Sequence, residues 1–131
     1  MTGDIRWLTR RMVEVFHAES VHRFGGDPGL RDEGLLESAI TRPRDRKAYD
    51  DSAGLPVLAA EYCAGIVRNH PFVDGNKRAG LLAAAVFPSL NGYSLVSDEA
   101  LTVTMIEGIA EGSIEIEALA AWIERSIQPN S

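Results

Sequence analysis

The stretch that decides the fold of this chain is HPFVDGNKR, at residues 70–78. It brings a base, an acid, a glycine, an amide and two cations into nine consecutive residues. Behind it, apolar residues recur at the spacing of one helix face, at Ala79, Leu82, Ala83, Val86, Phe87 and Leu90. Such a stripe is typical of a helix that packs against a core. The polar stretch therefore lies in a loop that leads into the N-terminus of a buried helix.

A helix N-terminus is a favourable place for a phosphate group. Its first backbone N–H groups have no intrahelical acceptor, and it carries the positive end of the helix dipole. Two adjacent cations, Lys77 and Arg78, are unfavourable at this position unless an anion compensates them. A bound phosphate would supply that anion, whereas a surface salt bridge explains one cation more readily than both. The stretch therefore favours transfer of a phosphate or a nucleotide.

The remaining residues of the stretch have a chemical or a structural interpretation. His70 is suited to act as a general base, because histidine is commonly neutral near pH 7, but it could simply end a helix. Asp74 could hold Mg²⁺ beside bound phosphates or cap the next helix. Asn76 could donate to a phosphate oxygen or serve as that cap. Gly75 permits a positive φ and a close approach of the backbone to a ligand, and Phe72 is expected to fill the core beneath the loop.

Hydrophobic periodicity along the rest of the chain predicts an all-α domain of about six helices. The expected helices span roughly residues 8–24, 30–41, 56–69, 76–90, 98–111 and 113–127. Pro43 is expected to stop the second helix, and Pro88 to kink or shorten the last turn of the fourth. Residues 43–53 are polar and show no periodicity, so we expect a loop there, or at most a small β-hairpin.

Composition limits the classes of function. The chain has 131 residues, 45% of them hydrophobic, and a formal net charge of −6. This length suffices to bury about two-thirds of the surface of the unfolded chain. A protein that binds nucleic-acid phosphates is normally basic, so we expect no direct nucleic-acid partner. The cations Arg42, Arg44, Arg46 and Lys47 could meet an acidic partner or form a solvated loop.

Other signatures are missing from the sequence. Cys63 is the single cysteine, which excludes an internal disulfide, and its apolar surroundings predict a packing role. There is no P-loop, no G-x-G-x-x-G and no zinc-ligand spacing, and His17 and His22 do not form H-E-x-x-H. Without a signal peptide or an apolar run of about 18 residues, we expect no membrane span and a cytoplasmic location.

The stretch at 70–78 resembles the signature of the Fic/Doc family, roughly H-x-F-x-[DE]-[GA]-N-[GK]-R. Flanking features are similar too: Arg42-Pro43 after a short helix, Tyr49, and Leu90-Asn91-Gly92-Tyr93. The short chain looks like the death-on-curing (Doc) branch. The resemblance covers nearly the whole chain and implies a single, mainly helical domain at residues 1–131.

The resemblance also implies a reaction and its residues. Fic proteins typically transfer AMP from ATP to a protein hydroxyl. By resemblance, His70 is the base and Asp74 holds Mg²⁺. The implied contacts to the phosphates of ATP are Gly75, Asn76, Lys77 and Arg78.

Two departures from the Fic pattern resemble the Doc branch instead. Lys77 stands where Fic members usually have a glycine that opens an anion hole, and Leu81 stands where they tend to carry a second arginine. Resemblance to Doc implies transfer of the γ-phosphate of ATP to a Ser/Thr hydroxyl of a translation factor, expected to be elongation factor Tu, which blocks translation. Gly75, in contrast, resembles the Fic pattern more than the Doc pattern, since the best-known Doc has alanine at this position.

The resemblance further implies partners. The family holds a target segment as an added strand, which we expect at residues 43–53. A Doc toxin is held off by a small antitoxin, so a cognate Phd-like antitoxin acting in trans is expected. Self-inhibiting Fic proteins carry [ST]-x-x-x-E-[GN], which neither Glu107-Gly108 nor Glu111-Gly112 matches. The alternatives are an AMP transferase of Fic type and a non-catalytic regulatory binding module, against which the intact motif argues.

Overall fold

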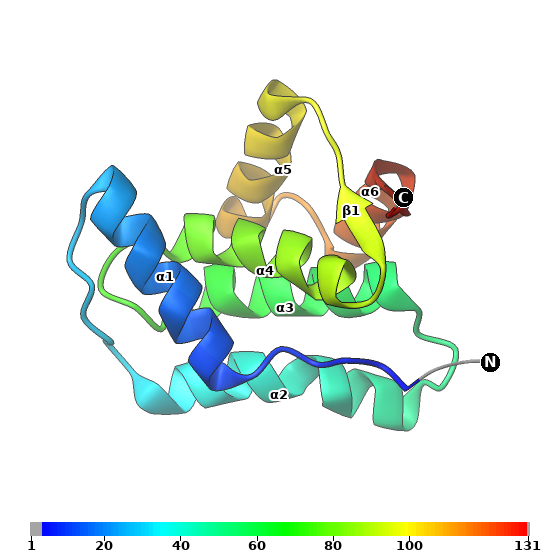
Figure 1. The fold of residues 1–131 in the computed structure, drawn as a ribbon, viewed down its shortest axis with the longest axis horizontal. Coiled ribbons are helices and arrows are strands. Elements are labelled where there is room, and N and C mark those ends of the chain that lie inside the picture. The colour runs from blue at the N-terminus through cyan, green and yellow to red at the C-terminus, as the bar shows by residue number, and fades with distance from the viewer. Residues whose placement is uncertain (1–3, 131) are drawn as a thin grey trace.

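Helices α3 (Leu55–Asn69) and α4 (Asn76–Leu90) form an antiparallel pair at the centre of the molecule (Figure 1). The computed structural model describes residues 4–130; residues 1–3 and 131 lie outside the described part. Every residue of α3 from 58 to 67 is buried. A helix that is apolar nearly all round has to be covered on every side. The other helices provide that cover, and they share one hydrophobic core with the central pair.

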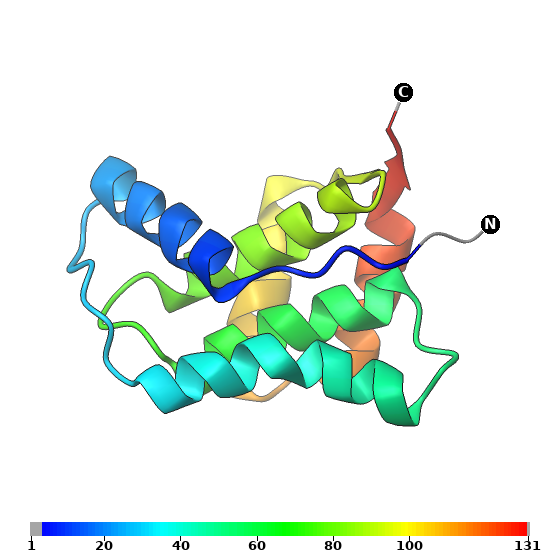
Figure 2. The ribbon, with the colours of Figure 1, turned by 60° about the horizontal axis from the view of Figure 1, so that its bottom comes forward.

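The remaining helices surround the central pair (Figures 1 and 2). They are α1 (Arg10–Phe24), α2 (Glu33–Tyr49), α5 (Glu99–Glu111) and α6 (Ile116–Ser126). Helices α2 and α6 pack on α3, α1 packs on α4, and α5 contacts both central helices. The all-α prediction is confirmed. Across residues 4–130, no helix combines the length and the apolar composition of a membrane span.

Two short strands close the end of the fold opposite the motif loop. β1 (Tyr93–Leu95) pairs antiparallel with β2 (Ile127–Pro129), with Ser94 opposite Gln128. The turn before β1 follows α4, which ends at Leu90 as predicted. Pro88 is buried in the last turn of α4 and does not shorten that helix. The last turn tolerates the proline because only the hydrogen bond that its missing N–H would donate is lost.

The prediction of a loop or hairpin at residues 43–53 was wrong for residues 43–49, whereas residues 50–53 form a loop as expected. Helix α2 passes through Pro43 and ends at Tyr49, so this region holds two more helical turns and no hairpin. A proline inside a helix is unfavourable by about 3 kcal/mol. Packing of α2 on the core offsets this, since Leu36, Ala39, Ile40 and Pro43 are buried. The Arg46 guanidinium also lies 2.8 Å from a Glu61 carboxylate oxygen that is nearly buried. Lys47 then donates to the carbonyls that follow the helix.

The basic side chains of α2 are therefore largely engaged within the chain. Arg44 lies over the Trp7 ring, 5.5 Å from its centroid, and Arg46 binds Glu61. Cys63 is fully buried in α3, which confirms the prediction of a packing role. Burial raises the pKa of the Cys63 thiol to about 12, so the reactive thiolate does not form near neutral pH.

Gly80 allows the close approach of α3 and α4. A Cβ atom at this position would lie 2.5 Å from Val67 Cγ2 and 3.1 Å from the Cys63 carbonyl oxygen. Gly80→Ala is therefore expected to lower the free energy of unfolding by about 1–3 kcal/mol, despite the higher helix propensity of alanine. Gly34→Ala, at an exposed position of α2, is the matched control, because there the atom nearest to the added Cβ is at 3.4 Å. Urea denaturation should find this control neutral or slightly stabilised; equal losses would contradict the packing argument.

Candidate active site

The motif loop joins α3 to α4 at one end of the molecule (Figure 1). Both of its ends have left-handed backbone. His70 ends α3 with φ 55° and ψ 53°, and Gly75 precedes α4 with φ 79° and ψ 19°. His70 is the one non-glycine residue of positive φ within residues 4–130. This conformation is unfavourable by about 1–2 kcal/mol for a residue with a Cβ, so neighbouring groups have to hold it.

Arg31 holds the strained end of α3. Its Nε donates to the His70 carbonyl at 2.7 Å, and its Nη2 donates to the Asn69 carbonyl at 2.9 Å. The Pro71 carbonyl accepts two backbone N–H groups, from Arg31 at 2.7 Å and from Asp32 at 3.0 Å. These contacts fix the position of the His70 backbone and leave its side chain exposed.

The segment between α1 and α2 runs beside the motif loop. Leu30 and Phe72 form an isolated antiparallel bridge, and the N–H of Val73 donates to the Gly29 carbonyl at 2.9 Å. Figure 1 shows the two loops next to each other at the same end of the molecule. The segment that borders the candidate site is thus residues 25–32, and not residues 43–53.

Asn76 braces the motif loop from inside. Its side chain is almost fully buried, with the amide oxygen accepting the N–H of Phe72 at 3.0 Å and the amide nitrogen donating to the Phe72 carbonyl at 2.9 Å. Phe72 is also buried, which confirms that it fills the core beneath the loop. A direct contact of the Asn76 side chain with a phosphate stays a prediction, whereas its bracing of the loop is visible.

His17 is a site residue that the sequence interpretation missed. Its ring is buried and stacks on Phe72, with the ring centroids 3.6 Å apart. Its Nε2 lies 2.7 Å from the Asp74 carbonyl oxygen, which can only accept, so Nε2 carries the proton. A Cβ at Gly75 would come within 3.4 Å of this nitrogen. Its place on the buried face of α1, four residues after Val13, was the available signal.

The Asp74 side chain is exposed and does not cap α4. The N-cap of α4 is Gly75, and no side chain caps that helix, so the interpretation of Asp74 or Asn76 as a cap was wrong. Asp74 Oδ2 accepts the N–H of Asp27 at 2.8 Å, and its other oxygen accepts no hydrogen bond from residues 4–130. The same residues contain no group of three or more metal-ligating side chains. One carboxylate is nevertheless enough for Mg²⁺ that arrives with phosphates, so the donor fits.

The N-terminus of α4 offers an anion site. The first helical bond runs from the Ala79 N–H to the Gly75 carbonyl, so the N–H groups of residues 76–78 have no intrahelical acceptor. An open pocket of about 260 Å³ lies here, lined by His70 and residues 73–78. The loop therefore places a base, a carboxylate and unpaired backbone donors around one space.

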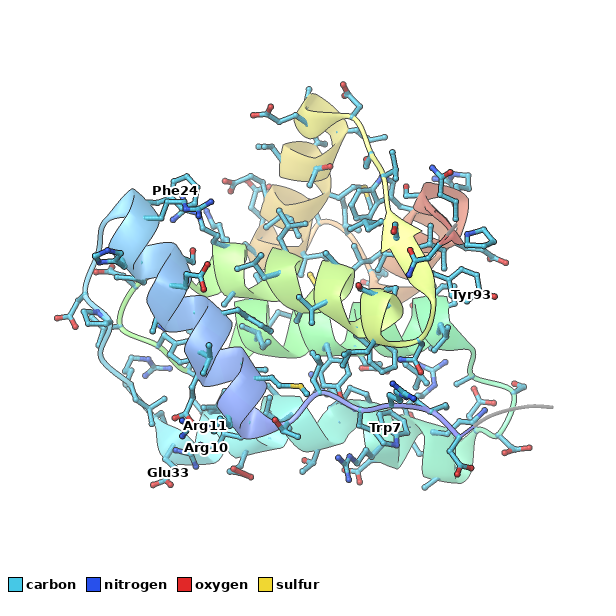
Figure 3. The ribbon with its side chains drawn as sticks, viewed as in Figure 1. Trp7, Arg10, Arg11, Phe24, Glu33 and Tyr93 are labelled. Carbon is cyan, nitrogen blue, oxygen red and sulfur yellow. The ribbon has the colours of Figure 1, made fainter. Side chains whose placement is uncertain are left out.

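Each of the two motif cations has a partner within the chain. Lys77 Nζ lies 2.9 Å from Glu107 Oε1 on α5. The Arg78 guanidinium lies 4.3 Å from the centroid of the Phe24 ring. Phe24, labelled in Figure 3, is the last residue of α1. The cations alone therefore do not require a bound anion, contrary to the argument from the sequence. Both partners are partly exposed, so a ligand can displace them.

Comparison with known proteins shows the family of the chain. The profile of the Fic/DOC family matches residues 7–88, more than half of the chain. The chain is 31% identical over 121 residues to "Protein kinase doc" of Escherichia phage P1, covering 92% of this chain and 95% of that protein. It is 40% identical over 86 residues to "Toxin Doc" of Mycolicibacterium smegmatis, covering 65% of each. The resemblance to the Doc branch is thus confirmed, and the chain belongs to the Fic/DOC family.

Proposed function

We propose that this protein is a Doc-like toxin that transfers the γ-phosphate of ATP to a Ser/Thr hydroxyl of a translation factor, with elongation factor Tu as the first candidate. One observation carries the proposal: His70, the Asp74 carboxylate and the free N–H groups of α4 border a single pocket. The relative named as a protein kinase supports this reaction class, and the relative named as a toxin supports the role of a toxin. Its place of action would be the cytoplasm, where translation factors work.

Each residue of the motif loop has its own role in the proposed reaction. Bound Mg²⁺, held by the free oxygen of Asp74, would neutralise charge on the phosphates of ATP. The N–H groups of residues 76–78 stabilise the charge that develops on the transferred group, together with Lys77 and Arg78. His70 accepts the proton of the target hydroxyl as the new O–P bond forms and the bond to ADP breaks. Asn76 and His17 keep the loop in shape.

A target segment would bind along residues 29–31 as an added strand. Because the Gly29 carbonyl and the Arg31 N–H bond to the motif loop, the Leu30 N–H and carbonyl point to the opposite edge. Among residues 4–130 no backbone group bonds to that edge, so it can pair with an extended peptide, and Leu30 is exposed.

A cognate Phd-like antitoxin would act by covering this site. A second pocket, of about 170 Å³, lies between α1 and α4 and shares Arg78 with the first. Its wall includes Phe16 and Phe24, and the Phe24 side chain is 62% exposed. An apolar face of this kind next to a reactive loop suits an amphipathic segment of an inhibitor.

The test is transfer of label to purified elongation factor Tu, with Mg²⁺ and ATP labelled on the γ- or on the α-phosphate in parallel reactions. Label from the γ-position alone is the expected result. Label from the α-position would assign AMP transfer, the alternative that Gly75 favours by its match to Fic. No label from either position would contradict an enzyme that acts on this factor.

Lys77→Gly tests the choice between the two reactions. The change removes a cation from the first turn of α4, together with a side chain that borders the pocket beside His70. We expect phosphoryl transfer to fall about tenfold or more, in line with the loss of a charged contact to a phosphate. AMP transfer should become detectable by the α-label. A variant with the wild-type rate and product would show that Lys77 does not direct the reaction.

A further inference from the structure

Lys77 is held by a carboxylate that lies outside the motif. The ion pair between Lys77 Nζ and Glu107 Oε1 spans 2.9 Å and joins the first turn of α4 to the middle of α5. Both side chains are about half exposed, at 53% and 47%. Glu107 takes no part in the proposed reaction, yet it engages one of the two cations that the reaction uses.

Packing of α5 against the core holds the backbone of Glu107 in place. Its neighbours Ile106 and Ile109 are buried in the core. Arg68 of α3 donates through Nη2 to the Ile114 carbonyl at 2.9 Å, which fixes the corner between α5 and α6. The carboxylate therefore stays near α4 as a fixed charge. The lysine, with its flexible four-carbon stem, is the partner that can move.

We propose that Glu107 is a positioning residue for Lys77 and competes with phosphate for its ammonium group. The proposal rests on the proposed function in one respect, namely that the anion bound at the N-terminus of α4 belongs to ATP. In the free protein Glu107 holds Lys77 on the side of α5. A phosphate either takes the ammonium from the carboxylate or binds with an uncompensated negative charge nearby. Glu107 thus weakens the binding of polyphosphate, because it already neutralises part of the positive charge of Lys77 in the free protein.

The geometry makes this effect specific to Lys77. A pocket of about 270 Å³ between α4 and α5 has both Lys77 and Glu107 in its wall, and Lys77 also borders the pocket beside His70. Arg78, by contrast, rests on the neutral ring of Phe24 and forms no ion pair within residues 4–130. Because the ion pair is exposed, its strength is limited, and removal of Glu107 should tighten anion binding by about twofold to fivefold.

The experiment compares four variants with the wild-type chain: Glu107→Gln, Lys77→Gln, the double variant, and Glu111→Gln as the matched control. Glu111 ends the same helix, is exposed, and forms no ion pair within residues 4–130. Calorimetry measures binding of inorganic tripolyphosphate and of ATP with Mg²⁺. Glu107→Gln should bind both about twofold to fivefold more tightly, and Glu111→Gln should match the wild type. In the Lys77→Gln background, Glu107→Gln should have no effect, and added salt should reduce the gain.

Other results would overturn the inference. Unchanged or weaker binding by Glu107→Gln excludes competition, and equal tightening with and without Lys77 shows a general field effect. Wherever phosphoryl transfer is measured, Glu107→Gln should lower KM for ATP by the same factor and change kcat by less than about twofold. Binding with the predicted pattern but no transfer from ATP would sustain the inference and contradict the proposed function. Binding by none of the variants contradicts both.

Discussion

His70→Asn is expected to lower the rate of phosphoryl transfer by about a hundredfold to ten-thousandfold, the contribution that a positioned general base usually makes. The reason is geometric as well as chemical. His70 stands at the end of α3 beside the anion site, with its side chain exposed and its carbonyl held by Arg31. Steady-state transfer measured at saturating ATP gives the loss in kcat.

Asparagine is preferred over alanine because of the backbone. His70 has a φ of 55°, and asparagine tolerates this left-handed conformation better than alanine does. His70→Asn should therefore unfold at nearly the wild-type urea concentration, while His70→Ala should lose both activity and some stability. If His70→Asn, or a folded His70→Ala, keeps transfer within tenfold of the wild type, His70 is not the base.

Asp74→Asn is expected to reduce transfer at least about a hundredfold at a fixed Mg²⁺ concentration, because a metal ligand loses its charge. Asparagine can still accept the N–H of Asp27 through its side-chain oxygen, so the loop should keep its shape. The rate should recover in part as Mg²⁺ is raised, and a titration of the rate against Mg²⁺ measures this.

The neighbouring carboxylate provides the control for Asp74. Asp27 lies on the adjoining loop, and its Oδ1 accepts the N–H of Gly29 at 2.7 Å. Asp27→Asn removes a charge near Asp74 yet preserves that acceptor, so it should change the rate by no more than a few fold. Equal losses in the two variants would point to a general effect of charge, and an unchanged Mg²⁺ dependence of Asp74→Asn would exclude Asp74 as the metal ligand.

The helices could be predicted because their signal is local. The apolar stripe behind the motif predicted a helix at 76–90, and α4 has these bounds. The error at 43–53 has a long-range cause. Pro43 and the polar residues after it give no helical signal, but Arg46 reaches Glu61, fifteen residues along the chain, and holds the helix together. A contact of that kind cannot be read from local periodicity.

In the candidate site, too, local features could be predicted and long-range contacts could not. Its motif lies in one short stretch, so the sequence could identify His70 and Asp74 as a possible base and metal ligand. The residues that shape the site come from other elements. His17 reaches the Asp74 carbonyl from 57 residues away, and Arg31 reaches His70 from 39 residues away. Glu107 binds Lys77 from α5, although its sequence context did not match a self-inhibitory motif.

Intact-protein mass spectrometry of elongation factor Tu, after incubation with this protein, Mg²⁺ and ATP, tests the proposed reaction and its target together. We expect a gain of one phosphate on the factor with the wild-type protein and no gain with His70→Asn. A gain of one AMP would contradict γ-phosphate transfer and place the chain's activity with the Fic enzymes. An unchanged mass of the factor would contradict elongation factor Tu as the target.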